Sequence, residues 1–247
     1  TTGNITQGIA LAITGTATFI TAANASNIIL DDASNVFTGA VTFKADTGGN
    51  ETFGNITFVD SAAVKLDANA DAAGDLFIDA STDGVVGGDL SITATTGNIT
   101  QGIALAITGT TTLTTSANDA TITLSNTSNA FTGAITITTN DASGTDADVT
   151  IDGGTTALIL AASTIDGDLT LLDGNASGIT DTGTVTVGGN LSVTTDANSG
   201  VINMGTLAVD GTIAANPNGS GSVTLVNDAG LDFAATSIGS GGLTATA

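Results

Sequence analysis

The chain contains a long identical repeat, which restricts its fold more than any other feature of the sequence. Residues 1–16, TTGNITQGIALAITGT, recur unchanged at 95–110, an offset of 94 positions. The likeness extends further, because 29 of 44 positions are identical between 1–44 and 95–138. Self-similarity at a fixed period predicts a repeat architecture in which each unit buries its apolar face against the next one.

A third, more divergent copy begins near Gly188, where GGNLSVTT echoes the GGDLSITA of residues 87–94. We therefore expect one continuous repeat domain over 1–247. Its large repeats are expected at 1–94, 95–196 and 197–247, the last of them partial.

A shorter unit lies inside the large repeats: Gly, a small polar residue, an apolar residue, and usually Thr or Ser. It appears as GNIT (54–57), GDLFI (74–78), GDLSI (88–92), GDLTL (167–171), GNLSV (189–193) and GSVTL (221–225). Two of its spacings, 54 to 74 and 167 to 189, are 20 and 22 residues. This pattern predicts an all-β fold, a right-handed parallel β-helix (β-solenoid) of about 20 residues per coil, arranged in larger repeats of about 94–102 residues.

Residue composition and alternation favour the same fold. The sequence has 33 Gly and only one Pro, and its large apolar residues are mostly Ile, Val and Leu spaced by Thr, Ser, Asn and Asp. In the stretch 184–195, TVTVGGNLSVTT, apolar residues alternate with Thr and Ser, as expected for strands with one buried and one wet face. No sustained helical periodicity is present.

A tandem array of immunoglobulin-like sandwiches is the main alternative fold, because about 94–102 residues is also the length of one such domain. The absence of Trp and Tyr, and the short unit that recurs inside each block, argue against it.

The charge distribution excludes several partners. The net charge is −22, and the only cations are Lys44 and Lys65. Such a charge repels phosphate backbones and anionic lipids, so we expect no nucleic-acid partner. No apolar run is long enough to span a bilayer, so we expect no membrane insertion.

The residue types also argue against catalysis and cofactors. The chain has no His, Cys or Arg, so a nucleophilic triad would lack its base. We therefore expect a protein that is not an enzyme. Calcium is the one ion we considered, because Asp141, Asp146, Asp148 and Asp152 form a cluster of hard oxygen ligands. The simpler interpretation is that these are solvated turn aspartates.

The motif SNxFTGA occurs in both of the best-matched repeats. It contains Asn35, Phe37 and Gly39 in the first repeat, and Asn129, Phe131 and Gly133 in the second. We expect a structural role: each Asn satisfies backbone groups at a bend, and each Phe fills the interior.

Alternating threonines occur at 16–21, 110–115 and 134–139, as in ice-binding solenoids. Because these segments are scattered along the sequence, we do not expect a continuous ice-binding face.

The order of GNITQGIALAITGT, SNxFTGAVTF and GGDLSIT resembles the repeats of filamentous-haemagglutinin-like large exoproteins and of related bacterial β-strand-repeat surface proteins. The resemblance is strongest over 1–44 and 87–138. It implies a secreted β-helix displayed as a long fibre for adhesion, with this stretch forming part of the shaft.

The expected function is therefore structural. The chain would be the shaft of an extracellular cell-surface fibre or adhesin, with a host or neighbouring cell surface as a possible partner. Alternatively, it would be a filament subunit that polymerises head to tail through its solenoid ends. The sequence is compatible with either function, because Thr1 falls inside a repeat and the stretch 241–247, GGLTATA, resembles the start of another coil.

Overall fold

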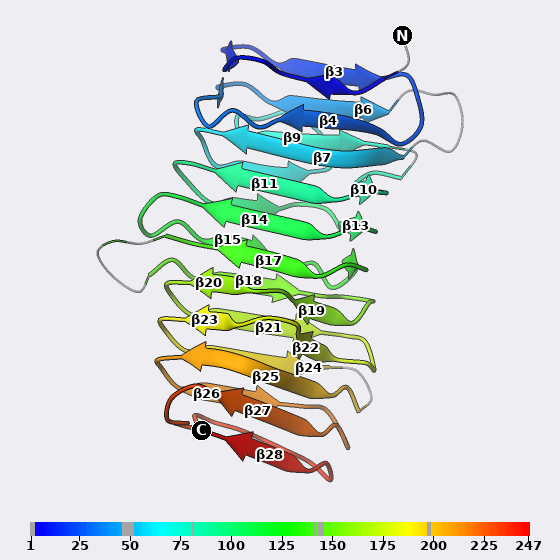
Figure 1. Cartoon of the computed structure of the whole chain (residues 1–247). Helices are drawn as coiled ribbons and strands as arrows, with labels where there is room; N and C mark the ends of the chain where they lie inside the picture. The colour runs from blue at the N-terminus through cyan, green and yellow to red at the C-terminus, as the bar shows by residue number, and fades with distance from the viewer. Residues whose placement is uncertain (1–2, 46–51, 81, 141, 143–145, 197–198) are drawn as a thin grey trace.

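The protein is a parallel β-solenoid. The structure, a computed structural model, describes residues 3–45, 52–80, 82–140, 142, 146–196 and 199–247. The chain winds as a right-handed coil of about ten turns with about 23 residues per turn (Figure 1). With no helix in the described residues, none is long and apolar enough to cross a membrane. The described strands number 28, and all their pairings are parallel.

Two large sheets form opposite walls of the coil. The 16-stranded sheet contains β1 (Ile5–Thr6), β4 (Ser26–Leu30), β7 (Phe53–Asp60), β10 (Val85–Val86), β11 (Leu90–Ala94), β13 (Ala106–Ile107), β14 (Thr111–Thr115), β16 (Ala130–Phe131), β17 (Ile135–Thr138), β19 (Leu158–Leu160), β20 (Ser163–Ile165), β22 (Ile179–Asp181), β23 (Val185–Val187), β25 (Ile202–Val209), β27 (Val223–Asn227) and β28 (Leu243–Thr246). The 10-stranded sheet contains β3 (Ala17–Thr21), β6 (Val41–Ala45), β8 (Val64–Asp67), β9 (Asp75–Asp79), β12 (Ile99–Gln101), β15 (Ile122–Leu124), β18 (Val149–Asp152), β21 (Leu169–Asp173), β24 (Leu191–Thr195) and β26 (Ile213–Asn216). The short strands β2 (Ala12–Ile13) and β5 (Val36–Phe37) pair with each other.

The coils are unequal in length. Leu169 pairs with Leu191 and Leu191 with Ile213, both steps of 22 positions, close to the expected 20. Other steps are longer, such as the 34 positions between the partners Ile56 and Leu90. The expected coil length was therefore too short on average. Long turns lengthen some coils, and β9, an extra strand that follows β8 in the same sheet, lengthens another.

The interior is filled by stacked apolar side chains. One stack in the 10-stranded sheet runs through Ile99, Ile122, Val149, Leu169 and Leu191, which are all at most 1% exposed. Burying each such side chain stabilises the fold by about 1.5–3 kcal/mol before chain entropy is counted. Because each stack continues from coil to coil, the core is a column rather than a globular centre.

Immunoglobulin-like sandwiches are excluded by this architecture. Such domains consist of antiparallel strands, whereas every strand pair in the described chain is parallel and links successive coils. Both folds have strands in which buried and exposed residues alternate, so the sequence alone did not exclude the sandwich.

The two large repeats lie half a turn out of phase. β1 belongs to the 16-stranded sheet, but β12, whose sequence repeats it 94 positions later, belongs to the 10-stranded sheet. The same exchange separates β3 from β14 and β4 from β15. The exchange follows from the number of crossings between the two sheets. From β1 to β12 the chain crosses seven times, which is an odd number, because the consecutive strands β8 and β9 lie in the same sheet.

Candidate functional site

A ladder of Asn and Asp side chains runs along a corner of the first coils. The side-chain oxygen of each residue accepts the backbone N–H of the equivalent residue one coil further on. Asn4 accepts from Asn27 at 3.0 Å, Asn27 from Asn55 at 2.8 Å, Asn55 from Asp89 at 3.0 Å, and Asp89 from Thr110 at 2.7 Å. The ladder thus satisfies corner N–H groups that the strand pairing does not reach.

A second ladder runs along the later coils. Asp148 accepts from the Asp168 N–H at 2.8 Å, Asp168 from Asn190 at 2.7 Å, and Asn190 from Thr212 at 2.9 Å. Asp168 and Asn190 are the small polar members of a GDL unit and a GNL unit seen in the sequence. At Asn55, Asp89, Asp168 and Asn190 the polar residue of the unit therefore makes a coil-to-coil hydrogen bond, which its spacing in the sequence did not reveal.

A glycine precedes most of the ladder residues, and close contacts with the preceding coil explain it. A Cβ added to Gly54 would collide with the side-chain oxygen of Asn27, and one added to Gly88 would collide with that of Asn55. Gly109, Gly167 and Gly189 meet the preceding ladder residue in the same way. At these steps glycine leaves room for the ladder oxygen, whereas at the first step Ser26 precedes Asn27.

The predicted bend glycines also lie at close approaches. A Cβ on Gly39 would come within 2.5 Å of the Gly15 carbonyl oxygen, and one on Gly133 would collide with the Gly109 carbonyl. Phe37 and Phe131, from the same motif, are each 1% exposed. Phe37 joins a cluster with Phe19, Phe43 and Phe58 and lies 5.2 Å from the ring centre of Phe58.

The two motif asparagines are fully buried and make equivalent networks. Asn129 Oδ1 accepts from the Leu105 N–H at 2.9 Å and from Gln101 Nε2 at 2.9 Å, and its Nδ2 donates to the Asp152 carbonyl at 3.0 Å. Asn35 bonds the Leu11 N–H and Gln7 in the same manner. The partner of each Asn is thus a Gln on the preceding coil, which the sequence reasoning missed although the Gln lies in the identical segment.

Of the four aspartates considered for calcium, the structure describes Asp146, Asp148 and Asp152, which form no group placed to hold a metal. Asp141 lies outside the described residues, Asp148 belongs to the ladder, and Asp152 Oδ1 accepts from the Gly154 N–H at 2.8 Å. Asp146 is exposed. In the described part of the chain, no group of three or more acidic side chains is placed to hold a metal.

Asp152 instead belongs to an acidic corner with Asp173 and Asp196. Asp173 is 1% exposed, and neither of its carboxylate oxygens has a hydrogen-bond partner of normal geometry. Burial, and then the neighbouring charges of Asp152 and Asp196, raise the pKa of Asp173 to about 7, against a smaller opposing effect of the Asn175 backbone N–H. Burial also raises the pKa of Asp152.

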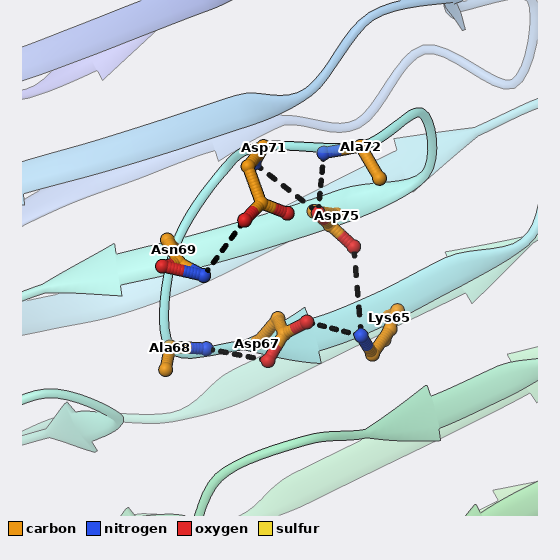
Figure 2. A network of polar contacts seen from close by, with 7 residues as sticks. All are labelled: Lys65, Asp67, Ala68, Asn69, Asp71, Ala72 and Asp75. Atoms are coloured by element: carbon orange, nitrogen blue, oxygen red, sulfur yellow. Dashed lines mark hydrogen bonds and ion pairs between the residues drawn. The ribbon is translucent and has the colours of Figure 1, made fainter.

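A polar network joins β9, the extra strand of the 10-stranded sheet, to the neighbouring β8 (Figure 2). Buried Asp75 accepts from the Ala72 N–H at 2.7 Å and from the Asp71 N–H at 3.2 Å, which fixes the loop between β8 and β9. Its other oxygen lies 4.0 Å from Lys65 Nζ. Lys65 also contacts Asp67, and this contact, followed by the Ala68 N–H, lowers the pKa of Asp67.

These features define a repeat protein whose polar side chains serve the coil. The chain belongs to the family described as repeats of unknown function (DUF5649), which matches residues 1–44, 53–138 and 146–205. No curated protein and no solved structure matches the chain.

Proposed function

We propose that this chain is the shaft of an extracellular cell-surface fibre or adhesin of the filamentous-haemagglutinin-like kind, without catalysis or cofactor. The observation that carries the proposal is the continuity of hydrogen bonding along the rod axis. Strand ladders, corner ladders and the buried Asn networks all join one coil to the next. These coil-to-coil hydrogen bonds resist extension and bending of the rod.

A shaft acts through its length and stiffness. At about 4.8 Å per coil, about ten turns give a rod of about 48 Å, and further repeats would lengthen it in proportion. The net charge of −22 keeps such rods apart laterally and gives no attraction for nucleic acid or anionic lipid. Adhesion to a host or neighbouring cell would belong to the fibre as a whole.

Electron cryo-microscopy of the native material tests this proposal. We expect thin continuous fibres with an axial reflection near about 4.8 Å. Antibodies raised against the purified chain should also label intact, unpermeabilised cells. Labelling that appears only after permeabilisation would contradict the extracellular role, and particles without the axial reflection would contradict the shaft.

One observation favours a second candidate, an ice-binding surface. Thr112 and Thr114 of β14 pair in register with Thr136 and Thr138 of β17. Ser91 and Thr93 of β11 continue both rows. Two of the three threonine segments are thus stacked rather than scattered, whereas 16–21 lies in the other sheet. Paired rows of hydroxyl and methyl groups on a regular sheet could order water.

An ice recrystallisation assay tests this candidate with a matched control. We expect Thr112→Lys with Thr136→Lys to abolish any inhibition of crystal growth, because the two lysines interrupt one row. The control, Thr123→Lys with Thr150→Lys, places the same residues at paired outward positions in the opposite sheet. If the unmodified protein leaves crystal growth unchanged, the candidate is rejected.

A further inference from the structure

Asp173 and Thr195 occupy the same interior corner position on two successive coils. Asp173 is the last residue of β21 and Thr195 is the last residue of β24, and the two pair in register. Each is in phase with the inward side chains of its strand, and each is 1% exposed. The chemistry of the two side chains can therefore be compared at one place in the fold.

The hydroxyl of Thr195 ties the following turn to the wall of the coil. It donates to the Gly200 carbonyl at 3.0 Å, five residues further on, and it accepts the Asn218 N–H at 3.2 Å. Thr115, the last residue of β14, donates in the same way to the Ala120 carbonyl at 3.2 Å. Two other corners thus place a side chain with a proton to donate at this position.

Asp173 brings a carboxyl group to the same position. Neither of its oxygens has a hydrogen-bond partner of normal geometry in the described part of the chain. The charged groups that act on it are Asp152 on the preceding coil and Asp196 after β24, and both are acidic. The two lysines belong to the earlier strands β6 and β8. A buried carboxylate without donors or a counter-charge is unstable, whereas a neutral carboxylic acid is less so and has an O–H to donate.

The turn behind Asp173, residues 174–178, is held by hydrogen bonds around Asn175. The Asn175 carbonyl accepts the Gly178 N–H at 2.9 Å, and its Oδ1 accepts the Ser177 N–H at 2.8 Å. Strand β21, in contrast, pairs with β18 on one side and with β24 on the other. A change at Asp173 can therefore release the turn more readily than the strand.

We propose that the turn 174–178 is a pH-sensitive latch, closed when Asp173 carries a proton and open when it does not. In the closed state the neutral carboxyl group is buried and donates within the corner, as the Thr195 hydroxyl does. When the proton passes to water, the carboxylate moves out to solvent, and the turn moves with it while the strand pairing of β21 persists. The latch is independent of the fibre role, because it belongs to one corner of the coil.

Amide hydrogen exchange of the purified chain tests the latch, with each rate corrected for the intrinsic effect of pH. Because opening releases one proton, protection of the Ser177 and Gly178 amides should fall about tenfold per pH unit between about 5 and about 7 and then level off. Protection that stays constant across this range would overturn the proposal.

A turn with the same two hydrogen bonds lies after Leu124 and is a matched control in the same molecule. There Asn126 accepts the Ser128 N–H at 2.9 Å and the Asn129 N–H at 3.1 Å. Leu124 precedes this turn at the spacing at which Asp173 precedes the latch, and its side chain cannot ionise. Protection there should not change with pH. An equal fall in both turns would overturn the proposal, because the whole coil would then be opening.

Two substitutions separate the donated proton from the charge. Asp173→Thr supplies the hydroxyl found at Thr195, whereas Asp173→Val has nearly the same shape without a donor. Both should abolish the pH dependence, and Asp173→Thr should retain the greater protection at Ser177 and Gly178. A pH dependence that survives in Asp173→Thr, or equal protection in the two variants, would overturn the proposal.

Infrared spectroscopy reads the proton directly. Ordinary carboxyl groups are ionised at pH about 6. We therefore expect a carboxylic-acid band at this pH in the unmodified chain, and a weaker one in Asp173→Thr. Identical spectra of the two proteins would overturn the proposal, because Asp173 would then carry no proton.

Discussion

The carboxylate of Asp89 accepts the backbone N–H of Thr110 at 2.7 Å and occupies the space that a Cβ on Gly109 would need. One contact therefore explains two parts of the recurring unit. The acid or amide supplies the hydrogen bond, and the glycine of the next coil makes room for it.

The identical segment provides an internal test of this relationship. Gly109→Ala should destabilise the fold by about 1–3 kcal/mol, because the new methyl group displaces the Asp89 side chain and presses on Gly88. Gly15→Ala is the matched control, since a Cβ on Gly15 meets no atom within 4 Å. Urea unfolding followed by circular dichroism measures both. Equal losses would mean that the cost comes from glycine's backbone freedom and not from the ladder.

Removing a buried corner amide should cost more. Asn129→Ala leaves the Leu105 N–H and the Asp152 carbonyl without their partner, so we expect a loss of about 3 kcal/mol. Asn140→Ala removes an exposed amide that donates to the Ser116 carbonyl at 3.2 Å, and it should cost less than about 1 kcal/mol. A loss at Asn129 no larger than at Asn140 would show that water replaces the network.

The acidic corner should make stability depend on pH. Asp173 has a pKa of about 7 in the folded chain and an ordinary value near 3.8 when unfolded. The folded state therefore retains a proton that the unfolded state loses, so stability falls as pH rises from about 4 to about 7. The loss amounts to at most about 4 kcal/mol, and Asp152, with its raised pKa, acts in the same direction.

Asp173→Asn should flatten this dependence and raise the melting temperature at pH about 8. Asp210→Asn, at an exposed position, is the matched control and should leave the profile unchanged. Thermal unfolding across this pH range gives the comparison. A variant that retains the full pH slope would place the titrating group elsewhere.

The stability of β9 should depend on Asp75 more than on Lys65. Asp75→Ala removes the acceptor for two backbone N–H groups and should cost about 2 kcal/mol, whereas the exposed Lys65→Met should cost less than about 1 kcal/mol. Hydrogen exchange should show faster opening of β8 and β9 in the first variant. Unchanged exchange there would mean that packing alone holds the strand.

The repeats in the sequence predicted the architecture well, because a solenoid repeats its contacts as its sequence repeats. Alternation correctly placed residues such as Val185 and Val193 inside. The coil length was less accurate, since the excursion through β9 has no counterpart in the second repeat. The exchange of the two repeats between the sheets could not be predicted, because an identical local sequence can form a strand in either sheet.

Side-chain partners were the least predictable part. Asn129 was expected at a bend, but its bond to Gln101 joins residues 28 positions apart on adjacent coils. The same holds for two of the aspartates considered for calcium: Asp148 and Asp152 are close in sequence, yet Asp148 accepts the Asp168 N–H and Asp152 accepts the Gly154 N–H.

The odd number of sheet crossings per repeat has a consequence for how such proteins diversify. When a segment of 94 residues is duplicated, its outward side chains reappear on the opposite side of the rod. A recognition surface that arose once would therefore be copied into a molecule that contacts two neighbours at the same time, one on each flank.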